Sequence, residues 1–341
     1  MAPPRIPKLA VPLEVGTDGR FKTVEQDSVD EVAGCAYAVI ATELGSRPEQ
    51  ITFGVEDPTF DQFPLDLSEW AAALEEWEPR AEHEDWRRAN AKIAVQIEDR
   101  KEPGDFLCLP FGVCHRRLTE LHPDLTAVET GIGYAGAFAR HRIYESYAWM
   151  HVALGRQGHD PDGMDEWAVI PNYFETEDFP AGEPEDYLLY VGRMTDRKGV
   201  HLAARVAEAT GHELILAGEG EERPAYGDYI GPVGPDARAE LMSHAKALIC
   251  PTRYVEPFGG VAVEAQLCGT PVITTDWGAF TETVEQGSGF RCRTWADFLL
   301  AAVDVAGLDR AEIRLRAQDR WSLEAVAPQF ESYFNRIEET A

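Results

Sequence analysis

The feature that most constrains the fold is an alternation of short apolar runs with helix-like segments after residue 184. The apolar runs are DYLLYVG, HELILAGEG, ALICPT and PVITTD, and the segments between them are HLAARVAEAT, DARAELMSHA and GGVAVEAQLCG. Strands that read as nearly continuous apolar runs are buried on both faces, and the helices between them are typical crossover connections. The pattern therefore predicts a parallel sheet covered by helices on both sides.

The earlier part of the chain shows two different patterns of predicted secondary structure. From residue 104 the order is again strand, helix, strand, in FLCLPFG, HRRLTELH and LTAVET. Residues 1–100 instead indicate an α+β arrangement. Its expected elements are a hairpin from Leu9–Val15 and Phe21–Val24, a helix capped by Ser28, a second helix from Asp66 or Ser68 to near Trp77, and a final strand at Lys92–Ile97. Breaks at EDRKEPGD and FPAGEPED predict three parts, 1–100, 101–180 and 181–341.

Charge and composition exclude several classes of partner. The chain carries 60 Asp and Glu against 31 Lys and Arg, for a net charge of −29, which argues against nucleic acid or an anionic membrane. No apolar run reaches the roughly 18 residues of a membrane span, and no signal peptide is recognisable, so a cytoplasmic protein is expected. Six cysteines are too sparse for a disulfide framework, and no metal-ligand spacing occurs, so no metal is expected.

Two loops at expected strand ends carry the residue types of an anion site. In VGRMTDRKG, Arg193 and Lys198 stand between a strand end and a helix start, where cations and helix N–H groups favour a diphosphate. In PFGGVAVE, Gly259 and Gly260 let backbone N–H groups approach an anion at the next helix N-terminus. Both loops are expected at the ligand-binding edge of one sheet.

Two glutamates, Glu256 and Glu264, lie eight residues apart around this glycine pair. Glu256 on the loop is expected to face a bound substrate, and Glu264 in the helix is expected to accept hydrogen bonds from vicinal ribose hydroxyls. The alternative is that both are solvated and that the glycines only turn the chain. The occurrence of both loops in this order on one sheet favours the binding site.

These motifs resemble a known family. VGRMTDRKG, EPFGGVAVEA and GTPVITTDWGAFTE resemble the second domain of a retaining glycosyltransferase of the two-Rossmann (GT-B) architecture, more narrowly the group-1 family that uses nucleotide sugars. Glu256 and Glu264 match the E-x7-E element of that family. The resemblance covers about residues 165–335.

The resemblance implies transfer of a hexosyl group from a UDP- or GDP-sugar with retention of configuration. No cofactor or metal is implied, because cations and helix dipoles stabilise the leaving diphosphate. It implies three catalytic residues: Glu256 at the donor sugar, and Lys198 and Arg193 on the diphosphate. Donor binding is further implied for Glu264 on the ribose and for the backbone of Phe258, Gly259, Gly260 and Val261.

The expected fold class is therefore α/β: a GT-B-like doubly wound Rossmann domain and a shortened Rossmann-like partner domain, preceded by a small α+β domain. The shortened domain, residues 103–172, contains GIGYAG, which matches GxGxxG without the acidic residue that NAD binding wants about 20 positions on. Gly131, Gly133 and Tyr134 are instead expected on the acceptor side. Three following aromatic residues either contact the acceptor or, as the spacing favours, pack in a core: Tyr144, Tyr147 and Trp149.

The first hundred residues resemble a different family. TVEQDSVDEV, ATELGSRPEQITFGVEDPTF and WEPRA resemble a phage tail baseplate wedge subunit, over about residues 8–98. This resemblance implies contacts with phage tail subunits or self-association through residues 1–100, in the host cytosol or the virion. Two alternatives to an active transferase follow, a baseplate protein with a vestigial transferase half and a nucleotide-binding module without catalysis. The acceptor is not identifiable from the sequence.

Overall fold

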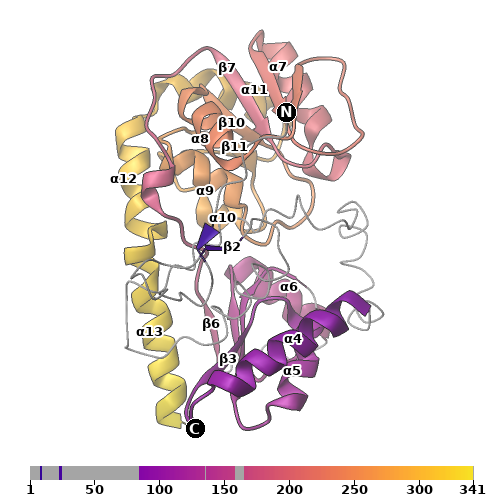
Figure 1. Ribbon diagram of the computed structural model, residues 1–341. Coiled ribbons are helices and arrows are strands. Elements are labelled where there is room, and N and C mark those ends of the chain that lie inside the picture. The colour runs from indigo at the N-terminus through magenta and orange to yellow at the C-terminus, as the bar shows by residue number, and fades with distance from the viewer. Residues whose placement is uncertain (1–7, 10–22, 25–83, 135, 158–164, 341) are drawn as a thin grey trace. The chain divides into compact units, whose positions relative to one another are not determined.

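The computed structural model describes residues 8–9, 23–24, 84–134, 136–157 and 165–340 (Figure 1). Contacts divide the chain into two compact units. The first unit comprises the described residues of Met1–Tyr144, Ala153–Ala168 and Glu331–Ala341, and the second comprises Glu145–Val152 and Val169–Phe330. Within the described residues, no helix is both long enough and apolar enough to cross a membrane.

The second unit contains a six-stranded sheet in which every pair of neighbours is parallel. The strand order is β12-β11-β10-β7-β8-β9, so the chain builds outward from β7 in one direction and then returns to build outward from β10 in the other. This is the doubly wound order, with its switch point between β7 and β10. The strands are β7 Tyr187–Val191, β8 Glu213–Ala217, β9 Asp228–Gly231, β10 Ala247–Cys250, β11 Val272–Thr275 and β12 Gly289–Cys292.

Helices cover both faces of this sheet, as the apolar runs predicted. In β7, Leu188 and Tyr190 pack against the side of α7 and α11, while Leu189 and Val191 pack against the side of α8 and α9. Figure 1 shows these helices around β7, β10 and β11. The helices of this unit are α7 Val200–Thr210, α8 Pro235–His244, α9 Gly260–Leu267, α10 Phe280–Thr283, α11 Trp295–Asp304 and α12 Arg310–Trp321, followed by α13 Leu323–Thr340, which ends in the first unit.

Two helix starts in this unit follow directly from local sequence. Thr294 accepts a hydrogen bond from the backbone N–H of Asp297, and the Asp297 carboxylate accepts one from the backbone N–H of Thr294, which is a capping box at the start of α11. Asp309 caps α12 through the backbone N–H groups of Ala311 and Glu312. Each cap stabilises its helix by about 1 kcal/mol.

The first unit contains a four-stranded sheet in the order β3-β4-β5-β6, with β3 parallel to β4 and β4 parallel to β5. Its core joins Leu107 and Leu109 of β3 to helices on one face of the sheet. The elements are α4 Glu84–Arg100, β3 Phe106–Leu109, the 3-10 turn Gly112–His115, α5 Arg116–Leu121, β4 Thr126–Ile132, β5 His141–Tyr144, α6 Tyr147–Gln157 and β6 Trp167–Val169.

The strand expected at Lys92–Ile97 is wrong, because these residues lie inside helix α4. Ile93 and Ile97 are buried four positions apart, which is helical spacing, whereas Val95 between them is 58% exposed. A short stretch of alternating apolar residues fits both periods, and contact with β3 and α5 decides for the helix. The helix thus packs on the sheet of the first unit.

Most of the other expectations for residues 1–100 lie outside the described residues. The antiparallel pair β1 Lys8–Leu9 and β2 Thr23–Val24 agrees with the expected hairpin, although its turn is not described. The helices expected at Ser28 and from Asp66 or Ser68, and most of the baseplate-like segment, fall in residues 25–83, outside the described ranges. The three-part division of the chain stays a prediction.

Candidate active site

The two loops singled out in the sequence meet at the switch point of the second unit. The loop after β7 and the loop after β10 are joined by a backbone hydrogen bond of 2.8 Å from Arg253 N to the Arg197 carbonyl oxygen. Gly199 (φ +80°) makes this approach possible, since a methyl group there would lie 2.1 Å from the carbonyl oxygen of Pro251. Adjacent parallel strands and a close loop contact therefore build one site from two distant segments.

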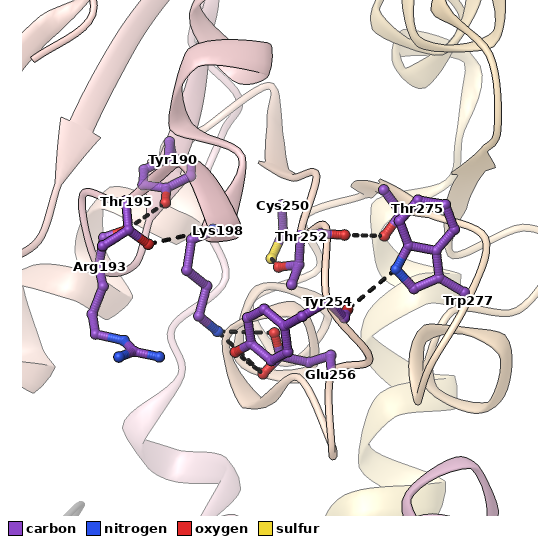
Figure 2. A network of polar contacts seen from close by, with 10 residues as sticks. All are labelled: Tyr190, Arg193, Thr195, Lys198, Cys250, Thr252, Tyr254, Glu256, Thr275 and Trp277. Carbon is purple, nitrogen blue, oxygen red and sulfur yellow. Dashed lines mark hydrogen bonds and ion pairs between the residues drawn. The ribbon is translucent and has the colours of Figure 1, made fainter. Parts of the chain in front are cut away.

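An ion pair joins the loops where both sequence-predicted charges lie. Lys198 Nζ is 2.8 Å from Oε2 and 3.1 Å from Oε1 of Glu256, and the side chains are only 17% and 10% exposed (Figure 2). The Thr195 hydroxyl accepts a hydrogen bond of 3.4 Å from the backbone N–H of Lys198, which stabilises the turn between these two residues. Burial by itself disfavours the ammonium, but the Glu256 carboxylate outweighs this effect and raises the pKa of Lys198 above its ordinary value.

Tyr254 completes the surroundings of Glu256. Its hydroxyl donates to Glu256 Oε1 at 3.2 Å, and its ring centroid lies 5.0 Å from Lys198 Nζ. Burial raises the pKa of the Tyr254 hydroxyl, which therefore stays a donor at neutral pH. The loop after β11 fixes the backbone, because Ala279 N donates to the Glu256 carbonyl oxygen at 3.0 Å and the Trp277 indole donates to the Tyr254 carbonyl oxygen at 3.2 Å. Sequence reasoning missed Tyr254, although it stands two residues before Glu256.

Arg193 supplies a second cation on the loop after β7. Tyr190 fixes its backbone by donating a hydrogen bond of 2.7 Å to the Arg193 carbonyl oxygen. Within the described part of the chain, the guanidinium of Arg193 makes no hydrogen bond or ion pair, and Figure 2 shows the side chain extending alongside that of Lys198. The site therefore holds one cation paired with a carboxylate and one whose donors are available to a ligand.

The N-terminus of helix α9 comes four residues after Glu256, at the end of the same loop. Gly259 (φ +80°) precedes the helix, Gly260 is its first residue, and Val261 is half-buried. The first N–H groups of a helix have no partner within it, and the two glycines add no side chain of their own at this end. The ring of Phe258 is buried and stacks on Phe174 with centroids 6.4 Å apart, so this residue offers its backbone and not its ring to a ligand.

Glu264 lies within α9 and is paired with an arginine that the sequence did not indicate. Arg238 Nε is 2.9 Å from Oε2 of Glu264, and an Arg238 terminal nitrogen donates to Oε1 at 3.3 Å. The side chains are 18% and 12% exposed, so both charges are largely withdrawn from water. The carboxylate of Glu264 is thereby held in one orientation.

A further carboxyl, Glu145, lies next to the loop that carries Glu256. Ser146 donates a hydrogen bond of 2.6 Å to the Pro257 carbonyl oxygen, and Asn172 Nδ2 donates to Glu145 Oε1 at 3.1 Å. Burial raises the pKa of Glu145 to about 7; the bond from Asn172 opposes the rise, and the negative charge of Glu256 adds to it. Sequence reasoning missed Glu145, because neither its neighbours nor its spacing marks it.

The residues expected on the acceptor side lie in the first unit. Gly131 is in β4 with φ +58°, and Gly133 N donates to its carbonyl oxygen at 2.9 Å. The Tyr134 side chain is buried and its hydroxyl lies 3.3 Å from Oε1 of buried Glu129. The other oxygen of Glu129 accepts the backbone N–H groups of Phe138 and Ala139 at 2.6 and 2.7 Å. The glycine-rich loop is thus organised around a buried carboxylate, and its role in acceptor binding stays a prediction.

The three nearby aromatic residues differ in burial, and acceptor contact by any of them stays a prediction. Tyr144 and Trp149 are buried, as expected of core residues, whereas Tyr147 is exposed. His115 is also buried, lies 2.8 Å from the side chain of Asn90, and has its pKa lowered to about 4 by burial. Among the described residues, no group of three or more His, Cys, Asp or Glu is arranged to hold a metal ion.

Comparison with known proteins gives a family pattern for the part of the chain that holds the two loops. Residues 185–317 match the family model of glycosyl transferases group 1. Glycogen synthase of Mycobacterium tuberculosis is 33% identical over 172 residues, which is 44% of this chain and 39% of that protein. D-inositol 3-phosphate glycosyltransferase of Segniliparus rotundus is 32% identical over 157 residues, 40% of this chain and 35% of that protein.

Solved structures give the class of fold. AviGT4, a glycosyltransferase involved in avilamycin A biosynthesis, superimposes with a TM-score of 0.63 at 23% identity, covering 74% of this chain and 79% of its own. The chain thus has the α/β fold of the GT-B glycosyltransferases. Residues 185–317, which hold both loops and both glutamates, carry the group 1 sequence pattern within it. The chain spans well under half the length of the curated relatives named here.

Proposed function

We propose that this protein is a retaining hexosyltransferase that moves a sugar from a UDP- or GDP-sugar to an acceptor. The observation that carries the proposal is the meeting of Lys198, Arg193 and the α9 N-terminus at the switch point of a doubly wound sheet. In a protein of net charge −29, cations gathered at such a point favour a diphosphate. The match of residues 185–317 to group 1 glycosyl transferases supports the same reading.

Each residue then has a role that its geometry supports. Arg193 and Lys198 bind the diphosphate and stabilise the negative charge that develops on it as the bond to the sugar breaks. The N–H groups of Gly259, Gly260 and Val261 add to this stabilisation without a metal ion. Glu264 accepts hydrogen bonds from the ribose.

Glu256 faces the donor sugar under this proposal. Its pairing with Lys198 and its hydrogen bond from Tyr254 hold its side chain in one orientation. A fixed carboxylate at this position stabilises positive charge developing at the anomeric carbon, which suits a transfer with retention. We place the reaction in the cytoplasm, where nucleotide sugars are made. The phage-tail alternative concerns mainly residues outside the described ranges, and no described contact favours it.

Calorimetric titration tests the donor site. Wild-type protein is titrated with UDP, GDP and their common sugars, and Lys198→Ala is compared with Arg117→Ala, which removes an exposed arginine that pairs only with Glu120 on the described surface. We expect Lys198→Ala to weaken binding about 10- to 100-fold and Arg117→Ala to leave it unchanged. A folded wild-type protein that binds neither nucleotide refutes the proposal.

Turnover is tested by release of the nucleoside diphosphate from the sugar donor that binds. Glu256→Gln keeps the shape of the side chain and removes its charge, so turnover should fall while nucleotide affinity is kept. Equal turnover in wild type and Glu256→Gln would remove Glu256 from the reaction. The anomeric configuration of the first product, read by proton NMR, tests retention.

A further inference from the structure

Glu145 differs in its partners from the carboxylate of Glu256. Glu256 is paired with the ammonium of Lys198 at 2.8 Å. Within the described ranges, the one hydrogen bond of Glu145 comes from the neutral amide of Asn172, at 3.1 Å to Oε1. Its other oxygen, Oε2, makes no hydrogen bond with a described residue and is not closed off from solvent. One oxygen of this carboxyl is therefore fixed, and the other can accept a hydrogen bond from a ligand.

The backbone directly after this carboxyl is tied to the loop after β10 and to helix α10. Ser146 Oγ donates a hydrogen bond of 2.6 Å to the Pro257 carbonyl oxygen in that loop. The two oxygens of Glu282, in α10, accept the backbone N–H groups of Tyr147 and Ala148 at 3.0 and 2.8 Å. These bonds hold the start of α6 in place, so the carboxyl that precedes it is kept beside the loop of the candidate site.

The surroundings of Glu145 suit a group that takes up and releases a proton. Burial raises the pKa of Glu145 to about 7, the hydrogen bond from Asn172 opposes this rise, and the negative charge of Glu256 adds to it. A general base works best when its pKa lies near the pH at which the reaction runs. Two neighbouring carboxyls in different surroundings can divide the work, one as a fixed charge and the other as a proton carrier.

We propose that Glu145 is the general base of the sugar transfer, and that its Oε2 takes the proton of the acceptor hydroxyl. The acceptor oxygen forms a bond to the anomeric carbon as the bond from this carbon to the diphosphate oxygen breaks. The electron pair of the broken bond stays on the diphosphate, the proton moves to Glu145, and water takes it up afterwards. This inference rests on the transferase function proposed above, in which Glu256 is the fixed charge beside the sugar.

The first test compares two acceptors that differ in whether they carry a proton. The UDP- or GDP-sugar that binds in the titration is incubated with water alone or with added azide, and release of the nucleoside diphosphate is measured. Attack by water requires a base, whereas azide is an anion and requires none. We expect Glu145→Gln to lower turnover with water about 100- to 1,000-fold and to leave turnover with azide within about twofold of wild type. Glu208→Gln, an exposed position on α7, is the control and should leave both unchanged.

The second test follows turnover with water against pH, between about pH 6 and pH 9. A base acts only when ionised, so turnover of the wild type should rise with pH and level off above the pKa of Glu145, about 7. Glu145→Gln should lack this rise. The charged groups on the elements around it are Lys198 and Glu256, on the loops after β7 and β10, and Glu282 on α10. If one of these causes the rise, it persists in Glu145→Gln and the inference fails.

The outcomes separate this inference from the proposed transferase. If Glu145→Gln lowers turnover with water and with azide equally, the residue only supports the site, and the inference fails while the transferase stands. Equal turnover with water in wild type and Glu145→Gln also overturns it. If the folded wild type binds nucleotide but releases none from the donor with either acceptor, the proposed function fails and the inference falls with it. If Glu145→Gln does not fold, Glu145→Asp decides: the shorter carboxylate should slow water and spare azide, and an unchanged rate with water overturns the inference.

Discussion

Replacing Glu145 by glutamine should remove a pH dependence from the stability of the protein. The native pKa of Glu145 is about 7 against an ordinary value of 4.5, because burial disfavours the carboxylate. Below pH 4.5 this carboxyl is protonated in both the native and the unfolded state. Between 4.5 and 7 the unfolded state ionises while the native state keeps its proton, so the free energy of unfolding falls as pH rises.

The size of the effect follows from the difference between the two pKa values. A rise from 4.5 to about 7 corresponds to about 3 kcal/mol, which we take as about 2–3 kcal/mol because the side chain is only partly withdrawn from water. Glutamine has the same shape and can still accept the hydrogen bond from Asn172. The loss of stability between pH 5 and pH 8 should therefore be smaller in Glu145→Gln by about this amount.

Denaturant unfolding followed by tryptophan fluorescence at pH 5 and pH 8 measures this difference. Other titrating groups are shared by both proteins and largely cancel when the two differences are compared. Glu208→Gln, an exposed position on α7, is the matched control and should behave as wild type. The reasoning is refuted if wild type and Glu145→Gln lose the same free energy of unfolding between the two pH values.

Three further predictions concern the loops of the candidate site. Gly199→Ala should destabilise the protein by at least about 1–3 kcal/mol, seen as a lower Tm, since the position has φ +80° and a methyl group would lie 2.1 Å from the Pro251 carbonyl oxygen. Lys198→Met should cost about 3–5 kcal/mol in denaturant unfolding by leaving Glu256 buried without its partner, and adding Glu256→Gln should restore part of that loss; no recovery would mean that the pair is not coupled. Nucleotide affinity should be the same in excess EDTA as in Mg²⁺, because Arg193, Lys198 and helix α9 supply the charge; a loss of titration heat in EDTA would contradict this.

The sequence was sufficient for the strands and loops of the second unit because its signals there are local. A strand buried on both faces must be apolar throughout, and glycines with cations at its end mark the loop that follows. The prediction of a strand at Lys92–Ile97 was wrong because Ile93, Val95 and Ile97 alternate as residues of a strand do, while Ile93 and Ile97 also have the spacing of a helix. Packing against β3 and α5 decides for the helix.

The places of Arg238 and Glu145 in the site could not be predicted from the sequence, for a different reason. Their partners Glu264 and Asn172 are 26 and 27 residues away, on neighbouring elements, and nothing near either residue marks the pairing. The roles of buried charges depend on which helices and loops lie side by side. That information is in the order of the strands and not in any one segment.

The ion pair between Lys198 and Glu256 also makes the site a reporter of folding. The two residues are 58 positions apart, and they belong to loops on opposite sides of the switch point, one after β7 and one after β10. An intermediate with only β7, β8 and β9 assembled has Lys198 without its carboxylate and without helix α9. Nucleotide binding therefore requires both halves of the sheet to be joined, and the appearance of binding during refolding would time the step at which β10 docks against β7.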